Sequence, residues 1–216
     1  MSFLRRQRLN SNRDFCRFFS WGARILGGFK IRIQDRHNLN ESQPCVYVAN
    51  HQSGFDVVTF GALFPRRTLA VGKKEVIWIP FFNLIFLCGG NVLLDRSRRM
   101  RAVEKLRSIA SVLKKNQASV WIFPEGTRNR TYNGLLPFKK GAFHLAIETG
   151  LPIVPVVSSS LSDIFRQPKM FFRGGKVTLR VLPPIPTAGL KASDADRLSE
   201  MTRTQMAVAF QELATG

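Results

Sequence analysis

The chain has 216 residues, a length typical of one domain with a substantial core. A hydrophobic fraction of 44% excludes a disordered chain, and 33 Lys and Arg residues against 14 Asp and Glu residues give a formal net charge of +19. A field of this sign attracts polyanions: nucleic acid, an anionic bilayer or an acidic carrier protein. The three cysteines, Cys16, Cys45 and Cys88, have neither zinc-site nor disulfide spacing, so we expect a reducing compartment and no bound metal.

The N-terminal region predicts a basic amphipathic helix over residues 11–28. Aromatic and aliphatic side chains recur there at helical spacing, with arginines between them. The apolar positions are Phe15, Phe18, Phe19, Ile25 and Leu26, and the arginines are Arg13, Arg17 and Arg24. Such a helix either lies in a bilayer interface or packs its apolar face onto its own domain, and the pattern leaves both interpretations open.

The sequence has no signal peptide and no run of about twenty clean apolar residues, the length that a membrane-spanning helix needs. The nearest candidate is the uncharged segment 76–94, which is interrupted by Pro80 and by the pair Gly89 and Gly90. We expect this segment to be buried or to dip into a membrane rather than to span it.

Beyond residue 28, short apolar strands alternate with helices. The expected strands are 29–34, 46–49, 68–71, 92–94, 120–123, 153–157 and 177–182, and the expected helices are 55–63, 98–116, 142–149 and 193–214. Continuously apolar strands separated by helices predict one α/β domain with a largely parallel central sheet flanked by helices. Pro155 suggests that its strand lies near an edge or a bulge.

The first motif with chemical potential follows the strand 46–49. His51 stands five residues before Asp56, and within one straight helix the two side chains would point about 140° apart. They can meet if His51 lies in a loop and Asp56 in the first turn of the next helix, with Ser53 and Gly54 as loop and cap residues. Asp56 would then bind one ring nitrogen and leave the other as a base, although a spacing this simple also occurs without function.

A second motif follows the strand 120–123. Gly126 permits a tight turn with exposed backbone N–H groups, Thr127 supplies a hydroxyl, and Arg128 can bind a phosphate with two hydrogen bonds. An ordinary polar loop would have the same composition. Other cations that could reach an anion are Lys73, Lys74 and Arg96, each of which could equally be a solvated or salt-bridged surface charge.

Four stretches in this order resemble the glycerolipid acyltransferase family, and within it the bacterial 1-acyl-sn-glycerol-3-phosphate acyltransferases. They are Asn50 to Asp56, Gly90 to Arg96 (with Leu94 where Ile is usual), Phe123 to Arg128, and Leu151 to Val156. The resemblance covers about half of the chain. It implies that residues 29–216 form the acyltransferase domain and that residues 1–28 dock it on a membrane.

The resemblance also implies a reaction: an acyl group moves from a thioester to the 2-hydroxyl of 1-acyl-glycerol-3-phosphate and gives phosphatidic acid. His51 would take the hydroxyl proton, Asp56 would orient His51, and transfer would be direct, with no cofactor. Arg128 would hold the phosphate, together with Lys73 or Lys74 and with Arg96. Glu125, Gly126 and Thr127 would shape the glycerol site.

The implied partners are acyl-CoA or acyl carrier protein as donor, a lysophospholipid as acceptor, and an anionic membrane surface, with no nucleic acid. The expected location is peripheral, on the cytoplasmic face of a bacterial inner membrane. Two alternatives stay open within the enzyme class, lyso-ornithine lipid and glycerol 3-phosphate as acceptors. A basic lipid- or nucleic-acid-binding module without catalysis is the alternative of another class.

Overall fold

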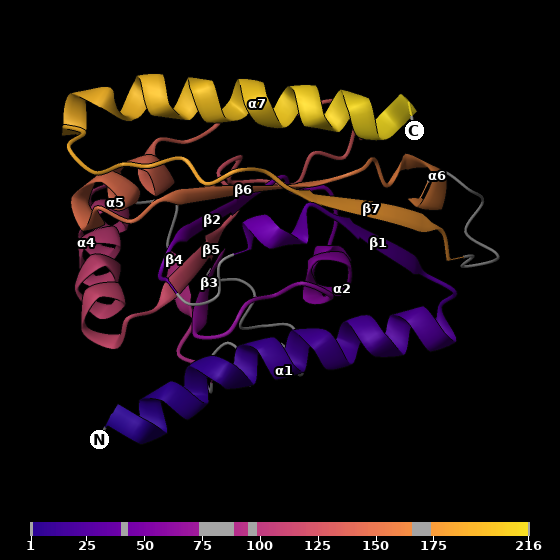
Figure 1. Cartoon of the computed structure of the whole chain (residues 1–216), viewed down its shortest axis with the longest axis horizontal. Helices are drawn as coiled ribbons and strands as arrows, with labels where there is room; N and C mark the ends of the chain where they lie inside the picture. Colours follow the sequence, from indigo (N-terminus) through magenta and orange to yellow (C-terminus); the bar gives the residue numbers. More distant parts are fainter. Residues whose placement is uncertain (1, 40–42, 74–88, 95–98, 166–173, 216) are drawn as a thin grey trace.

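The computed structural model of the chain describes residues 2–39, 43–73, 89–94, 99–165 and 174–215. Within these residues, seven strands form one sheet in the order β1-β7-β6-β2-β5-β3-β4 (Figure 1). The strands are β1 (Lys30–Gln34), β2 (Val46–Ala49), β3 (Thr68–Lys73), β4 (Val92–Leu94), β5 (Ser119–Ile122), β6 (Ile153–Ser158) and β7 (Lys176–Val181). The predicted α/β domain with a largely parallel sheet is therefore confirmed.

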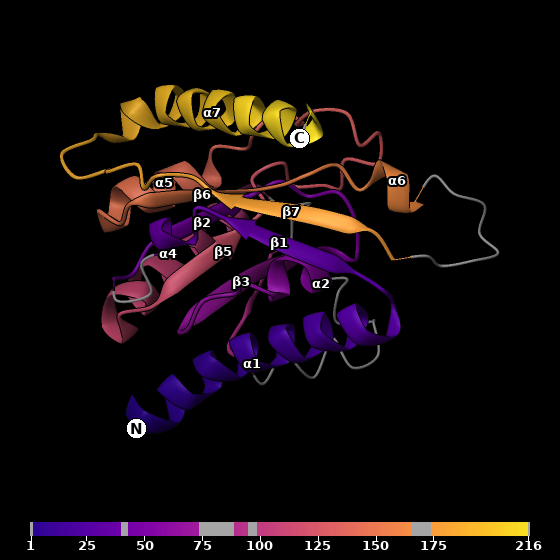
Figure 2. The ribbon, with the colours of Figure 1, turned by 45° about the vertical axis from the view of Figure 1, so that its right-hand side comes forward.

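The helices are α1 (Ser2–Leu26), α2 (Asp56–Gly61), α4 (Arg99–Asn116), α5 (Gly141–Thr149), α6 (Ser162–Phe165) and α7 (Ala195–Thr215), with 3-10 turns η1 (Arg36–Asn38) and η3 (Ala192–Asp194). Figures 1 and 2 show α7 along one face of the sheet and α1 with α2 on the other. None of the described helices is long and apolar enough to cross a membrane. The segment expected to be buried or membrane-dipping lies mostly at 74–88, outside the described residues.

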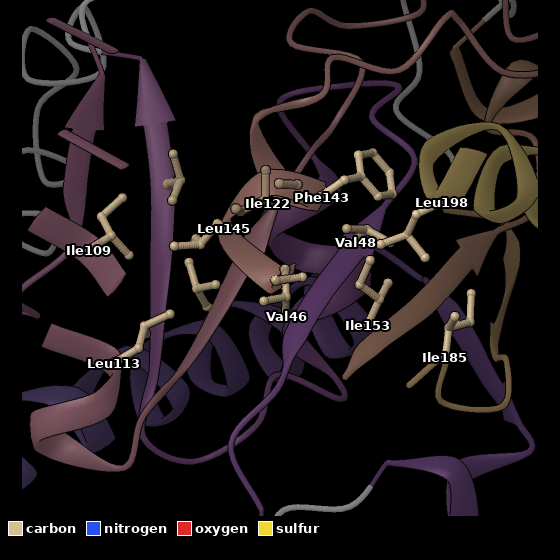
Figure 3. Packing of buried hydrophobic residues seen from close by; sticks show 14 of the residues in the cluster. Val46, Val48, Ile109, Leu113, Ile122, Phe143, Leu145, Ile153, Ile185 and Leu198 are labelled. Carbon is tan, nitrogen blue, oxygen red and sulfur yellow. The ribbon is translucent and has the colours of Figure 1, made fainter. Parts of the chain in front are cut away.

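Helices cover both faces of the sheet, which explains why the central strands are apolar at every position. In β2, Val46 and Val48 belong to the cluster under α4, α5 and α7, part of which Figure 3 shows. Tyr47 and Ala49 point to the opposite face and pack with Phe60 of α2. Each strand residue thus buries its side chain on one side or the other, and no position of β2 is left for a polar residue until the strand ends.

One strand reversal decides which strand ends meet. All neighbouring pairs in the sheet are parallel except β6 and β7, which are antiparallel. The amino ends of β1 and β7 therefore lie at the same edge of the sheet as the carboxyl ends of β2, β5 and β6. This edge is called the catalytic edge below, because the His51 motif follows β2 there.

Pro155 lies inside the sheet rather than at its edge, since β6 pairs with both β2 and β7. The register on the β7 side shifts by one residue between the Val156–Val181 pair and the Ile153–Ile185 bridge. Proline has no N–H to donate, so an offset beside Pro155 avoids a missing ladder bond. The prediction that this strand lies at an edge of the sheet is therefore wrong. The alternative prediction, a bulge, agrees with the one-residue offset in register.

Helix α1 packs against the domain through a different face from the one that carries the predicted aromatic stripe. Leu9, Asn12 and Ser20 are buried, and the backbone of Cys16 runs so close to α2 that a Cβ atom at Gly61 would lie 2.3 Å from the Cys16 carbonyl oxygen. Phe18, Trp21, Ile25 and Leu26 are instead exposed, with Leu26 90% accessible. One side of the helix is therefore packed on the domain, as one of the two interpretations expected, while the end of its apolar stripe faces outward. The bilayer setting stays a prediction.

Candidate active site

The two motifs come together because β2 and β5 are neighbours. Val48 pairs with Ile122, so both strands end at the catalytic edge, and the loops that follow lie side by side. The backbone N–H of Asn129 donates to the carbonyl oxygen of His51 over 2.7 Å. The His51 loop and the loop after β5 are thus joined directly, although the motifs are more than seventy residues apart in the chain.

His51 lies in the loop and Asp56 in the first turn of α2, so the structure brings the two side chains together. His51 Nδ1 lies 2.5 Å from Asp56 Oδ2. The same oxygen accepts backbone N–H groups from Gln52 at 2.8 Å and from Ser53 at 3.2 Å. Ser53 and Gly54 form the loop as expected, but the residue that caps α2 is Phe55.

The hydrogen-bond pattern assigns the proton on the His51 ring. Asp56 is 2% accessible, and its Oδ2 already accepts two N–H groups, so it acts as an acceptor toward the imidazole. Nδ1 of His51 therefore carries hydrogen, and in the neutral ring the lone pair belongs to Nε2. With the side chain 20% exposed, this second nitrogen is the basic atom offered at the surface.

Residues on either side of His51 anchor its loop to β6. The Asn50 amide donates to the Ser158 carbonyl over 3.0 Å and accepts the Ser158 N–H over 2.8 Å. The Gln52 amide bonds in the same way to the backbone that follows β6. It donates to the Ser159 carbonyl over 2.9 Å and accepts the Leu161 N–H over 3.0 Å. These side chains continue the β2–β6 pairing past the end of β2 and fix the backbone from which His51 projects.

The loop after β5 supports His51 from the other side. The His51 ring is stacked on Phe123, with ring centroids 4.2 Å apart and planes 17° from parallel. Glu125, 3% accessible, accepts the His51 N–H over 2.8 Å and the Leu136 N–H over 3.1 Å. Burial raises the pKa of the Glu125 carboxyl above its ordinary value, and the two backbone bonds oppose that rise. In this geometry Glu125 holds the site's backbone.

Two exposed cations lie near the glycine turn and the His51 loop. Gly126 has φ of 71°, a conformation that favours glycine. A Cβ atom there would lie 2.7 Å from Lys139 Cε, so the Lys139 side chain lies across the turn. The Arg128 guanidinium reaches back to the His51 loop, 4.0 Å from where a Cβ atom of Gly54 would be. Thr127, Arg128 and Lys139 are all exposed.

The remaining predicted cations are not placed. The backbone of Lys73 is the last residue of β3 and pairs with Leu94, but its side chain lies outside the described part of the structure. Lys74 and Arg96 also lie outside the described residues. In the described part, no group of three or more His, Cys, Asp and Glu residues could hold a metal ion.

Sequence reasoning missed Asn50, Gln52 and Lys139. The signal for Asn50 and Gln52 was present, since both are amides directly after a buried strand and flank the histidine. The sequence indicated a solvated surface charge at Lys139, and only the fold lays its side chain over Gly126.

A histidine held by a buried carboxylate, with the exposed Arg128 beside its loop, suits an enzyme that deprotonates a hydroxyl on an anionic substrate. The comparisons with known proteins give this class its family. The family model described as Acyltransferase matches residues 30–159, and the chain belongs to that family.

Individual relatives agree. The chain is 37% identical over 205 residues to the 1-acyl-sn-glycerol-3-phosphate acyltransferase alpha of Bos taurus, covering 94% of this chain and 71% of the relative. It is 36% identical over 202 residues to the 1-acyl-sn-glycerol-3-phosphate acyltransferase of Haemophilus influenzae, covering 91% and 83%. The crystal structure of the 1-acyl-sn-glycerophosphate acyltransferase PlsC from Thermotoga maritima superposes with a TM-score of 0.78 at 26% identity, covering 94% and 80%. The resemblance read from the four motifs is confirmed.

Proposed function

We propose that the protein transfers a fatty acyl group from an acyl thioester to the 2-hydroxyl of 1-acyl-glycerol-3-phosphate, giving phosphatidic acid. The observation that carries the proposal is the 2.5 Å contact between His51 Nδ1 and Asp56 Oδ2, made beside the Arg128 guanidinium. The relatives named above have this activity in their names.

The reaction follows from the assigned proton. Nε2 of His51 takes the proton of the 2-hydroxyl while its oxygen attacks the thioester carbonyl. Asp56 holds the ring and stabilises the imidazolium, because its carboxylate is buried and already aimed at Nδ1. When the tetrahedral intermediate collapses, the carbon–sulfur bond breaks and the imidazolium returns the proton to the leaving thiolate. Transfer is direct, with no acyl-enzyme and no cofactor.

The substrate phosphate binds at the glycine turn. Arg128 provides two N–H donors, and Lys139 adds a second positive charge that lies across Gly126. Gly126 and Thr127 line the glycerol, and Glu125 keeps the turn and the His51 loop in register. Lys73 or Lys74 and Arg96 stay proposed phosphate ligands.

The enzyme is proposed to work as a peripheral protein on the cytoplasmic face of a bacterial inner membrane, with acyl-CoA or acyl carrier protein as donor. Support comes from α1, whose Phe18, Trp21 and Ile25 are each more than half exposed. Residues 1–28 would be the docking segment and residues 29–216 the acyltransferase domain. Since the other side of α1 is packed, the triple substitution of Phe18, Trp21 and Ile25 by Ser tests docking better than truncation does. It should move the protein from vesicles to the supernatant.

The activity is tested by acyl transfer from radiolabelled acyl-CoA to lysophosphatidate in anionic vesicles. Wild type is compared with His51→Ala and with His144→Ala, an exposed histidine on α5. We expect phosphatidate from wild type and from His144→Ala, and a loss of about 10²-fold or more in His51→Ala.

The other outcomes separate the alternatives. Equal activity of wild type and His51→Ala would support the proposed acyltransferase activity but would show that His51 is not the base. No product from wild type, with acyl carrier protein tried as donor and glycerol 3-phosphate and lyso-ornithine lipid tried as acceptors, would contradict the proposal and favour a binding module.

A further inference from the structure

A hollow of about 530 Å³ lies at the end of α1, apart from the His51 site. Its walls come from the last turns of α1, from the start of β1 and from the start of β7. Four of its lining residues are cationic, namely Arg24, Lys30, Arg32 and Lys176. None of its lining residues is acidic. We call it the α1–β1 hollow.

The four cations have no acidic partner in the described part of the structure, where the ion pairs involve other residues. Lys30 and Lys176 are directly paired across β1 and β7, so their side chains leave the sheet on the same face, opposite to the face on which Phe29 and Val177 pack. They line the hollow at the open edge of the sheet, where β1 is the outermost strand. Like charges in such a pair repel each other. An anion bound between them would remove that repulsion, which makes the hollow complementary to a phosphate.

The hollow also has an apolar side. Trp21 and Ile25 line it, are 58% and 61% accessible, and continue into Leu26 at the end of the helix. Indole and aliphatic side chains beside cations match the boundary between headgroups and acyl chains, where the phosphate lies next to hydrocarbon. An acidic protein would meet the charges but would gain less from the exposed aliphatic tip.

Strand directions place the hollow at the catalytic edge. Lys30 and Lys176 are the first residues of β1 and β7, and these amino ends share an edge with the carboxyl end of β2. Phe29, a lining residue, stacks on Phe55 with ring centroids 6.3 Å apart. Phe55 immediately precedes Asp56, so one aromatic pair connects the hollow to the His51 loop. Figure 1 shows α2, which carries Asp56, between α1 and the sheet, with the end of α1 leading into β1 at the right.

We propose that the α1–β1 hollow binds the phosphate headgroup of an anionic phospholipid of the bilayer, distinct from the acyl acceptor, and so turns the catalytic edge toward the membrane. The inference adds a ligand to the membrane docking proposed above. It does not depend on which acceptor or donor the enzyme uses.

The test compares two triple variants of the full chain that lower the formal net charge equally. The first is Lys30→Gln, Arg32→Gln and Lys176→Gln in the hollow. The matched control is Lys114→Gln, Lys115→Gln and Lys191→Gln, all exposed and outside the hollow. Sedimentation with vesicles of phosphatidylcholine alone, or of equal parts phosphatidylcholine and phosphatidylglycerol, measures binding. Acyl transfer in neutral detergent micelles checks the active site of both variants.

We expect the hollow variant to lose about 10-fold or more in affinity for the phosphatidylglycerol vesicles, the control to lose clearly less, and both to keep their micellar activity. Equal losses would overturn the proposal, because they would show attraction by net charge alone. Normal vesicle binding with a selective loss of transfer from acyl carrier protein would also overturn it, since the occupant would then be a protein. Absence of transfer by wild type in micelles would count against the proposed function and leave the vesicle comparison as the test of the hollow.

Discussion

The two sides of the active site are built in opposite ways. Around His51 most polar groups have a partner: the ring meets Asp56, the loop backbone meets Glu125, and Asn50 is bonded twice to β6. The exception is the buried Oδ1 of Asp56, which has no hydrogen-bond partner among the described residues. Around Gly126, by contrast, the Arg128 and Lys139 side chains are exposed, and no ion pair of either occurs in the described residues.

The difference matches the roles proposed for the two sides. A base works only if its ring is already oriented, so its partners belong to the protein and are present before substrate arrives. A phosphate ligand works only if its hydrogen-bond donors are available, so its partner is left to the substrate. Changes on the base side should therefore lower kcat, and changes on the cation side should raise KM.

The largest effect is expected for Asp56→Asn. An amide keeps the size of the side chain but removes the charge that stabilises the imidazolium, so kcat should fall by about 10²-fold or more while KM changes little. Steady-state acyl transfer measures both parameters. The control is Asp35→Asn, an exposed aspartate whose φ of 52° asparagine also tolerates. A loss confined to KM would break the contrast between the two sides.

Arg128→Ala should have the next largest effect. Losing a charge-assisted bond to phosphate corresponds to a fall in kcat/KM of roughly 10- to 100-fold, mainly through KM. Arg128→Lys should recover part of it, because the charge returns without the paired donors. Arg130→Ala removes an exposed cation two residues away and should stay close to wild type. If the two alanine variants behave alike, Arg128 does not hold the phosphate.

Asn50→Ala tests how firmly the base side is anchored. It removes two hydrogen bonds and leaves the buried Ser158 N–H and carbonyl without these partners. The free energy of unfolding should fall by about 1–3 kcal/mol in urea denaturation, and kcat should fall with it. Asn133→Ala, at an exposed loop position, should leave both unchanged. An unchanged kcat in Asn50→Ala would show that the loop holds His51 without its link to β6.

The smallest effect concerns pH and Glu125. Burial raises the pKa of this carboxyl above its ordinary 4.5, so the protonated form is favoured by folding. Its contribution to stability is present below pH 4.5 and is lost as pH rises through the folded-state pKa. The free energy of unfolding of wild type, relative to Glu125→Gln, should therefore decrease from pH 4.5 toward neutral pH. An increase over that range would mean that the backbone bonds from His51 and Leu136 outweigh burial.

Much of the base side could be predicted from the sequence, because its key contact is local. His51 and Asp56 are five residues apart, and the only choice was between one helix and a loop followed by a helix. The cation side could not be completed in this way. Lys139 lies over Gly126 only because the loop after β5 returns to Pro124, where the Lys139 N–H donates to the carbonyl oxygen.

The anchors were missed for a related reason. The partner of Asn50 is 108 residues away, and nothing in the local pattern says that β6 lies next to β2. The sequence also left the orientation of α1 open, because periodicity shows that a helix has an apolar stripe but not which side the domain covers. Strand order and strand direction are long-range properties of the fold. They decide both the partner of Asn50 and the side of α1 that faces the domain.

The antiparallel step between β6 and β7 has a consequence for the route of lipids. Had β7 run parallel to β6, the start of β1 and the end of α1 would lie at the opposite edge, about 20 Å from His51 for a strand of this length. Under the proposed docking, α1 would then hold the reaction away from the bilayer. With the reversal, the proposed docking lets a lysolipid move sideways from the leaflet to His51 and lets the product return to the same leaflet, without either chain crossing water.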